Sequence, residues 1–185
     1  MLICGLDIET TGLLRGNNEK DHRIIEICMI VYDSVTREKK LTYTRRINPH
    51  RSIDAKAYEV HKINLADLIK CDDFSHVADS IIKILSRCDL AFAHNGEGFD
   101  FPFIVHELIR VGKTVPNFNV FDTMLKGRWA TADGKVPSLR ELSYSLDIEY
   151  DTEKAHGAEY DVSQMADCLF KGIDLGFYKN KINCY

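Results

Sequence analysis

Two carboxylates separated by one residue, Asp7 and Glu9, stand at the end of an apolar segment and are followed directly by Thr10-Thr11-Gly12-Leu13. Side chains alternate across a β-strand, so these carboxylates would share one face while their apolar neighbours enter the opposite layer. Adjacent anions at a core edge repel each other unless a cation joins them. The pair therefore suits a metal ion and phosphate chemistry, although a solvated strand end turning at Gly12 is the simpler interpretation of this segment alone.

A third carboxylate, Asp100, stands where the turn Asn95-Gly96-Glu97-Gly98 passes into a predicted helix. It could simply cap that helix, because Asp with Pro in the first turn is a common helix entry. On helical spacing, however, Asp100 shares a stripe with Ile104, Leu108 and Val111, which places it on the buried side. A buried carboxylate needs a partner.

A fourth carboxylate, Asp161, shares one helical face with Met165 and Leu169 near the end of the chain. His156 precedes it by five residues, about 140° away on a continuous helix, so we expect this histidine in the loop that enters the helix. A lone loop histidine is more commonly a surface residue.

The four carboxylates and the histidine are more informative together than singly. If all were structural, the core would hold several unpaired charges. Carboxylate oxygens select hard cations, so the set predicts Mg²⁺ or Mn²⁺, and the lack of Cys and His ligand spacing argues against structural zinc.

The elements that would position these groups follow from hydrophobic periodicity. Strands are predicted at 2–8, 24–33 and 40–48, and their short connections favour an antiparallel meander. A polar loop, 14–22, follows Glu9 closely and would flank the site.

The second half of the chain alternates helices with one more strand. A helix from residue 74 with Ser75 as its cap precedes a strand at 89–94, and the next helix follows the glycine turn. Ser138 and Glu141 form a predicted capping box, and the last helix should run from about 158 to 171. Strand, turn and helix in this order indicate an α/β unit.

The composition fits one domain spanning residues 1–185, with 45% hydrophobic residues. A net charge of −4 and a pI of about 6.0 argue against a protein that coats long nucleic acids, but a short footprint is compatible. Two clusters of basic residues could bind a short stretch of nucleic acid. The first is Arg45, Arg46, His50, Arg51, Lys56, His61 and Lys62, and the second is Lys126, Arg128, Lys135 and Arg140. Each could equally be a solvated face.

The six cysteines include no C-x-x-C pair and predict reduced thiols in a cytoplasmic protein. The segment Met1–Leu6 lacks a basic leader and meets Asp7 at once, so we expect neither a signal peptide nor a membrane span.

Taken together, the motifs resemble the DEDDh, DnaQ-like family of 3′-to-5′ exonucleases over nearly the whole chain. Asp7-Ile8-Glu9-Thr10-Thr11-Gly12 is similar to its first motif, the segment ending Phe99-Asp100 to its second, and His156-x-Ala158-x-x-Asp161 to its third. The groups it most resembles are polymerase III proofreading epsilon subunits, exonuclease X and, in the spacing from Asn95 to Asp100, three-prime repair exonucleases. Supporting stretches are His22-Arg23-Ile24-Ile25-Glu26-Ile27, Asn48-Pro49, Val60-His61-Lys62-Ile63 and Asp122-Thr123.

This resemblance implies a ribonuclease H-like α/β fold, with a mixed sheet of three antiparallel strands followed by parallel strands and flanked by helices. It implies that Asp7, Glu9, Asp100 and Asp161 hold two Mg²⁺ or Mn²⁺ ions for in-line displacement. His156 would be the general base. The branch of the family that uses tyrosine would need it at position 157, which is glycine.

The resemblance also assigns a substrate. The 3′ end of DNA, preferably single-stranded, would be held by Thr10, Gly12 and Leu13, with His61 and Asn95 beside the terminal nucleotide and its phosphate. Alternatives are an RNA 3′ exonuclease or oligoribonuclease on the same fold, and a non-catalytic module that binds strand ends or a polymerase. A polymerase partner is possible, but no tethering tail is visible, so we expect a free-standing enzyme without membrane association.

Overall fold

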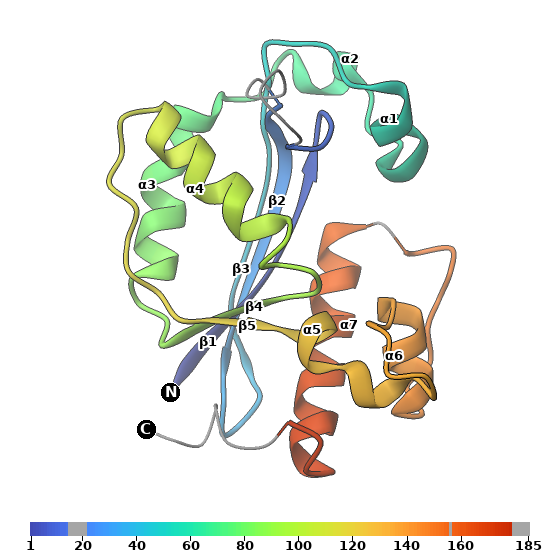
Figure 1. Cartoon of the computed structure of the whole chain (residues 1–185). Helices are drawn as coiled ribbons and strands as arrows, with labels where there is room; N and C mark the ends of the chain where they lie inside the picture. Colours follow the sequence, from blue (N-terminus) through green and yellow to red (C-terminus); the bar gives the residue numbers. More distant parts are fainter. Residues whose placement is uncertain (15–21, 156, 179–185) are drawn as a thin grey trace.

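A five-stranded mixed sheet with the strand order β3-β2-β1-β4-β5 forms the centre of the computed structural model, which describes residues 1–14, 22–155 and 157–178. β1 pairs antiparallel with β2 and parallel with β4, β2 pairs antiparallel with β3, and β4 pairs parallel with β5. This is the predicted mixed sheet (Figure 1). The strands are Leu2–Thr10 (β1), Ile24–Asp33 (β2), Lys39–Arg46 (β3), Leu90–Ala93 (β4) and Val120–Asp122 (β5).

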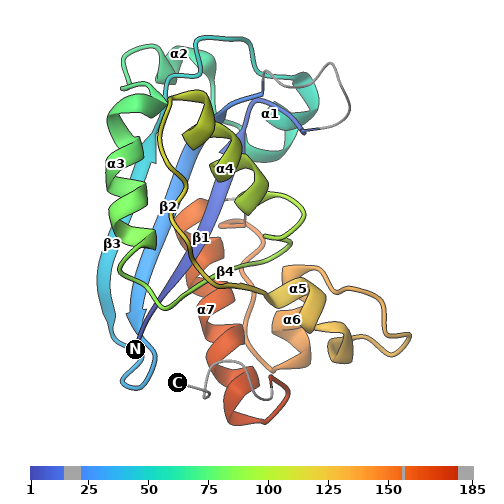
Figure 2. The same ribbon diagram turned by 60° about the vertical axis from the view of Figure 1, so that its left-hand side comes forward.

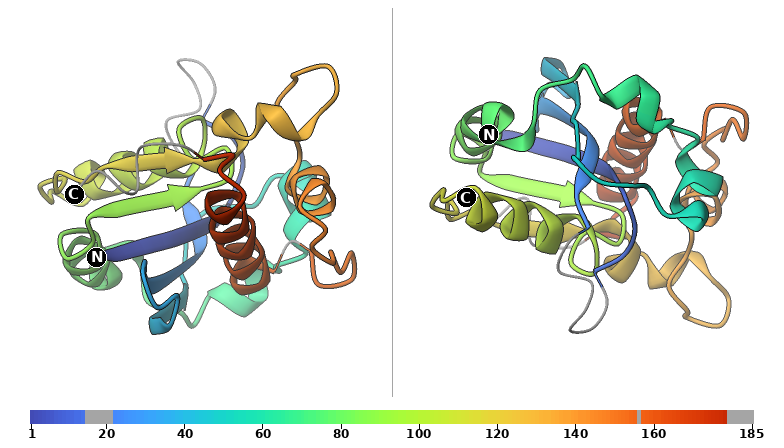
Figure 3. Two further views of the ribbon diagram at one scale, coloured as in Figure 1. Left: turned by 90° about the horizontal axis from the view of Figure 1, so that it is seen from below. Right: turned by 90° about the horizontal axis from the view of Figure 1, so that it is seen from above.

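Helices cover both faces of this sheet. Figures 1, 2 and 3 show α3 and α4 on one side of the strands and α7 on the other. The shorter helices α1 and α2 lie at one end of the sheet, and α5 and α6 lie beside α7 (Figure 1). The helices are Ala55–His61 (α1), Leu65–Leu68 (α2), Phe74–Leu85 (α3), Asp100–Arg110 (α4), Thr123–Lys126 (α5), Leu139–Ser145 (α6) and Ala158–Asp174 (α7), with a 3₁₀ turn at Arg128–Ala130 (η1).

Alternation along β1 separates the two cores. Leu6 and Ile8 are buried in the layer with α3 and α4, whereas Ile3 packs in the layer with α7. Asp7 and Glu9 therefore face the α7 side, as the strand pattern predicted.

Several predicted boundaries needed correction. β1 continues to Thr10, two residues beyond the predicted end, and β3 is Lys39–Arg46 rather than 40–48. Asp73, not Ser75, caps α3: its carboxylate accepts the Ser75 N–H, and a carboxylate is a strong acceptor at a helix start. α1, α2, α5 and β5 were not predicted because each is too short to show a period.

Other predictions are confirmed. Ser138 and Glu141 form the capping box of α6, and α7 begins at Ala158. None of the described helices combines the length and apolar composition that crossing a bilayer requires. Most of the predicted loop 14–22, together with His156, Cys184 and the tail from residue 180, lies outside the described residues.

The close packing of α7 on β1 depends on Gly5. A Cβ at this position would lie 2.7 Å from the Phe92 ring and 2.9 Å from Val162, the residue that follows Asp161 in α7. Because both neighbours are buried side chains, neither can move without disturbing the core.

We therefore predict that Gly5→Ala lowers the free energy of unfolding by about 1–3 kcal/mol through overpacking. Thermal unfolding by circular dichroism would measure this, with Thr42→Ala on the exposed strand β3 as the control. An unchanged Tm in Gly5→Ala would contradict the close packing of α7 on β1.

Candidate active site

Asp7 lies at the centre of a group of carboxylates near the end of β1. Burial raises its pKa well above the ordinary value, and repulsion from Asp100, Glu9, Asp161 and, most weakly, Glu26 raises it further. Like charges raise one another's pKa only at short range. The four carboxylates predicted from sequence therefore lie within electrostatic reach of one another.

Asp100 joins β1 to the start of α4. Its side chain is 2% exposed, and its Oδ1 accepts the backbone N–H of Ile8 at 3.2 Å, between Asp7 and Glu9. Burial raises its pKa to about 7, although hydrogen bonds from the backbone of Asp100 and Ile8 partly oppose the shift. The predicted burial is confirmed. The N-cap position belongs to Phe99, so Asp100 is not the N-cap residue.

Asp161 enters the site from the first turn of α7. It lines a cavity of about 550 Å³ together with Asp7, and Arg140, Tyr150 and His94 also border this space. Its charge raises the pKa of both Asp7 and Glu9. His156, the predicted general base, lies outside the described residues.

Glu26 is a fifth carboxylate that sequence reasoning did not assign to the site. The antiparallel register sets it directly opposite Glu9, and it forms an ion pair with Arg46 at 2.9 Å. Burial, followed by repulsion from Glu26, Asp161 and Asp100, raises the pKa of Glu9 to about 8. A single carboxylate inside the apolar run of β2 was the available signal, but the register that pairs Glu26 with Glu9 is visible only in the fold.

A second cavity, of about 420 Å³, opens beside Glu9 and is called the substrate cavity below. It brings together four of the five predicted substrate residues, Thr10, Gly12, Leu13 and His61. The fifth, Asn95, does not line it: it is exposed, and its backbone N–H donates to Asp122 Oδ1 at 3.2 Å. The remaining lining residues are His22, Asp54, Lys56, Ala57, Val60 and Phe99; among these, the sequence analysis named Lys56 in a basic cluster and assigned none of the six to the terminal nucleotide.

His61 lines this cavity with a ring of defined tautomer. Its Nδ1 accepts the backbone N–H of Ile63 at 3.0 Å, so in the neutral ring the proton lies on Nε2. Burial lowers its pKa, while a hydrogen bond with the backbone of Thr10 opposes the shift. The Nε2 atom is itself buried, so its proton faces the protein interior and not the cavity.

The chemistry of this donor set fits a divalent cation. Asp7, Glu9, Asp100 and Asp161 offer only carboxylate oxygens, the ligands that Mg²⁺ and Mn²⁺ prefer. A bound dication would offset the repulsion that raises their pKa values. Within the described ranges, no three His, Cys, Asp or Glu side chains already form a complete ligand set.

Comparison with known proteins assigns the family. The sequence model of the exonuclease family of the RNase T type matches residues 4–169. The chain therefore belongs to the DnaQ-like, DEDDh family of 3′-to-5′ exonucleases, whose members generally use divalent metals.

Two curated relatives illustrate this membership. The chain is 31% identical over 188 residues to DNA polymerase III subunit epsilon of Buchnera aphidicola, covering 96% of this chain and 76% of that protein. It is 28% identical over 156 residues to the 3′-5′ exonuclease DinG of Bacillus subtilis. That match covers 84% of this chain but only 16% of DinG, so the chain spans a small part of that relative.

Solved structures share the fold. Exonuclease X in complex with 5′ overhanging duplex DNA gives a TM-score of 0.67 at 20% identity, covering 96% of this chain and 94% of that chain. Escherichia coli exonuclease I in complex with a dT13 oligonucleotide gives a TM-score of 0.77 at 15% identity, and the match covers 95% of this chain and 42% of that chain. The nuclease domain of 3′hExo bound to rAMP gives a TM-score of 0.74 at 18% identity, and the match covers 95% of this chain and 92% of that chain.

The burial of the Asp100 carboxyl group makes a prediction about stability. Its raised pKa means that the folded protein holds a proton that the unfolded chain releases, so stability is lost as the pH rises from about 4 to about 7. Asp100→Asn keeps an acceptor for Ile8 and removes the charge. We expect the metal-free variant to have a Tm several degrees above wild type at pH 8, at about 2–4 °C per kcal/mol.

Differential scanning fluorimetry between pH 4 and pH 8, in the presence of a chelator, would measure the difference in Tm between Asp100→Asn and wild type. This difference should become smaller toward pH 4. The matched control is Asp79→Asn, an exposed carboxylate on α3 that is paired with Lys113. Equal Tm values for wild type and Asp100→Asn across the range would contradict a cost of burying the charged Asp100 carboxylate.

Proposed function

We propose that this protein is a metal-dependent 3′-to-5′ exonuclease that shortens DNA by releasing nucleoside 5′-monophosphates. The observation that carries the proposal is the group of carboxylates near the end of β1, bordered by the substrate cavity. Phosphodiester hydrolysis needs cationic stabilisation of the phosphate, and a carboxylate group of this kind is suited to supply it through divalent ions.

Each carboxylate has a role in this proposal. Asp7, Glu9, Asp100 and Asp161 would hold two Mg²⁺ or Mn²⁺ ions, and the charge of Asp7 interacts with those of the other three. When bound, the ions supply Lewis-acid activation of the phosphate and stabilisation of the leaving oxygen. The carboxylates set the positions of these charges, and the backbone hydrogen bond from Ile8 fixes Asp100.

His156 is proposed as the general base. It would accept a proton from water as the water oxygen bonds to phosphorus and the bond from phosphorus to the 3′ oxygen breaks. The shortened strand keeps a 3′-hydroxyl, and the released nucleotide carries a 5′-phosphate. Histidine titrates near neutral pH, so it can accept the proton and then return it to solvent.

The substrate cavity is proposed to hold the terminal nucleoside. Leu13 and Val60 offer apolar surface to a base, and the backbone at Gly12 allows close approach. His61, which lines the cavity, is a proposed contact for the terminal nucleotide. Asn95, which lies outside this cavity, stays only a predicted contact for the phosphate.

DNA is preferred as substrate because the solved complexes of exonuclease I and exonuclease X contain DNA. The 3′hExo domain was solved with rAMP, so RNA is the alternative that the same assay decides. A polymerase partner and a cytoplasmic location stay predictions. The five cysteines in the described part of the chain are free thiols, which supports a reducing compartment.

Removing a carboxylate and removing the histidine should lower the nuclease activity to different extents. We expect Asp7→Ala to abolish nuclease activity, because the charge of Asp7 interacts with those of all the other carboxylates in the group. His156→Ala should lower kcat by about 10²- to 10⁴-fold, the usual contribution of a general base. The assay is shortening of 5′-labelled single-stranded DNA, duplex DNA and RNA with Mg²⁺, read as a ladder on a gel.

The matched control for this assay is Asp79→Ala, which removes an exposed carboxylate outside the site. Shortening that persists in Asp7→Ala would contradict the assignment. A wild-type protein that is inert on all three substrates would favour the non-catalytic binding module.

The substrate cavity makes its own prediction at Gly12. A Cβ at this position would collide with the His22 ring and lie 2.8 Å from Asp54 Oδ2, both of which line the cavity. We expect Gly12→Ala to lower kcat/KM on a DNA oligonucleotide by about 10- to 100-fold, the effect of a small misplacement of substrate.

Gly134→Ala is a control for replacing a glycine outside the cavity: a Cβ there meets nothing within 4 Å, and the backbone strain that its φ of 71° brings falls in an exposed loop. Steady-state kinetics on one oligonucleotide would compare the two variants. A kcat/KM for Gly12→Ala equal to that of wild type would show that the terminal nucleotide does not occupy this cavity.

A further inference from the structure

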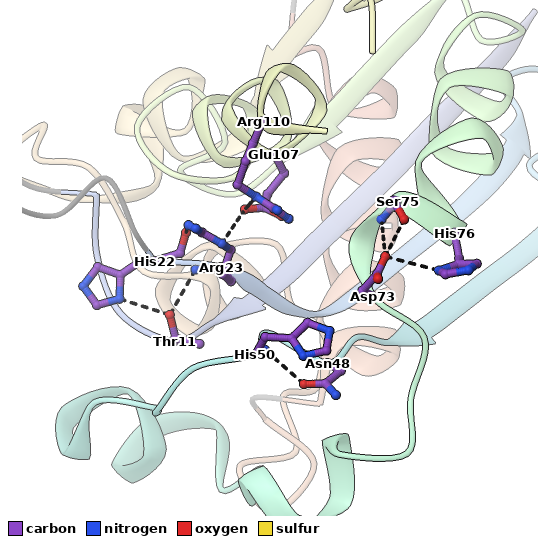
Figure 4. Close-up of polar contacts among 10 residues, drawn as sticks. All are labelled: Thr11, His22, Arg23, Asn48, His50, Asp73, Ser75, His76, Glu107 and Arg110. Carbon is purple, nitrogen blue, oxygen red and sulfur yellow. Dashed lines mark hydrogen bonds and ion pairs between the residues drawn. The ribbon is translucent and has the colours of Figure 1, made fainter. Parts of the chain in front are cut away.

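A basic cleft lies on the far side of His22 from the substrate cavity. It has a volume of about 600 Å³, and we call it the arginine cleft. Its walls come from the start of β2, the loop after β3, the first turn of α3 and the end of α4 (Figure 4). The residues that matter to its chemistry are His22, Arg23, His50, Arg51, Asp73 and Arg110.

Two of the arginines, Arg110 and Arg23, interact with one buried carboxylate, that of Glu107. Glu107 is 0% exposed, and it accepts two hydrogen bonds from Arg110, from Nε at 3.0 Å and from Nη2 at 2.6 Å. Arg23 Nε lies 3.8 Å from the same carboxylate (Figure 4). Two guanidinium groups share one negative charge, so the pair keeps a net positive charge.

The third arginine, Arg51, is held loosely. Its Nε donates to the Ser52 carbonyl at 3.3 Å, and it forms no ion pair with any residue in the described part of the chain. The opposing charge in the cleft is Asp73, which is occupied as the cap of α3 by the Ser75 N–H and hydroxyl and by His76. Arginine charge thus exceeds carboxylate charge in the cleft.

His22 connects this cleft with the substrate cavity, because it lines both. Its Nδ1 is hydrogen-bonded to Thr11 Oγ1 at 3.1 Å, and Thr11 directly follows β1. A DNA substrate whose terminal nucleoside occupies the substrate cavity, and whose strand continues from the scissile phosphate at the carboxylates, therefore has a second, positively charged site next to that cavity. A chain with a net charge of −4 would need such a local positive site to hold a polyanion.

We propose that the arginine cleft binds a backbone phosphodiester of the DNA substrate beyond its terminal nucleotide. The planar guanidinium fork matches two phosphate oxygens, and its charge does not titrate near neutral pH. Such a contact reads no sequence, and it adds affinity only for substrates long enough to reach it. This inference rests on the proposed exonuclease function for its substrate.

The test variant is Arg51→Glu, since Arg23 and Arg110 stabilise the buried Glu107 and could unfold the protein if removed. Anisotropy of fluorescein-labelled single-stranded and duplex 20-mer DNA, measured in EDTA, reports binding without cleavage. We expect about tenfold weaker binding at 50 mM salt. The slope of log K against log salt concentration should become shallower by about 0.7 for each single-strand phosphate that the variant no longer neutralises.

Two matched variants accompany it. Arg51→Lys keeps the charge and should retain most of the affinity. Arg87→Glu makes the same charge change on an exposed arginine just beyond the opposite end of α3, and it should bind as wild type does. Equal Tm values across the set would show that each variant folds.

A kinetic measurement distinguishes an effect at the arginine cleft from an effect at the active site. The p-nitrophenyl ester of thymidine 5′-monophosphate carries one nucleotide and cannot span both cavities. The ratio of kcat/KM on the 20-mer to kcat/KM on the ester should fall about tenfold in Arg51→Glu and stay unchanged in Arg87→Glu. Inertness of wild type on both substrates would refute the exonuclease proposal, while the binding arm would still test the cleft.

The two DNA forms identify which strand the cleft contacts. Weaker binding of both forms by Arg51→Glu supports a contact with the strand being shortened, and weaker binding of the duplex alone supports a contact with its complement. Wild-type affinity and salt slope on both forms would overturn the proposal.

Discussion

Several carboxylates are buried close together near the end of β1. Asp7 and Glu9 share a strand face, Glu26 lies opposite Glu9 in the register, and Asp100 and Asp161 arrive from two helices. Burial raises the pKa of Asp7, Glu9 and Asp100, and repulsion from neighbouring carboxylates raises those of Asp7 and Glu9 further, so folding costs free energy at this point. The rest of the fold must supply that free energy, and it does so through two apolar layers on the faces of the sheet.

The topology explains how the charges meet. β1 lies between β2 and β4, so one strand end adjoins the antiparallel half and the parallel half of the sheet. α4 begins just after β4 and brings Asp100 to the backbone of Ile8, while α7 crosses the other face and presents Asp161. Gly5 allows α7 to approach β1 closely, and Thr11 continues from β1 to hold His22 between the two cavities. A single strand thus organises the carboxylates, the substrate cavity and the arginine cleft.

Much of this arrangement could be predicted from sequence, because it depends on local periodicity. Alternation placed Asp7 and Glu9 on one face, and a helical stripe predicted the burial of Asp100. What failed depends on tertiary contacts. The three residues of β5 carry no period, the pairing of Glu26 with Glu9 follows from register, and the position of Asn95 outside the substrate cavity follows from how its turn packs on Asp122. The first predicted basic cluster also divides among different surfaces, since Arg46 pairs with Glu26 whereas Arg51 lines the arginine cleft.

The central claim is that the carboxylates near the end of β1 exist to hold two divalent ions. The most direct measurement is a crystal structure of the protein soaked with Mn²⁺, with anomalous differences collected at the manganese edge. We predict two anomalous peaks about 4 Å apart, with ligands from Asp7, Glu9, Asp100 and Asp161. The absence of any manganese peak at these carboxylates, with manganese bound only elsewhere on the molecule, would contradict the account.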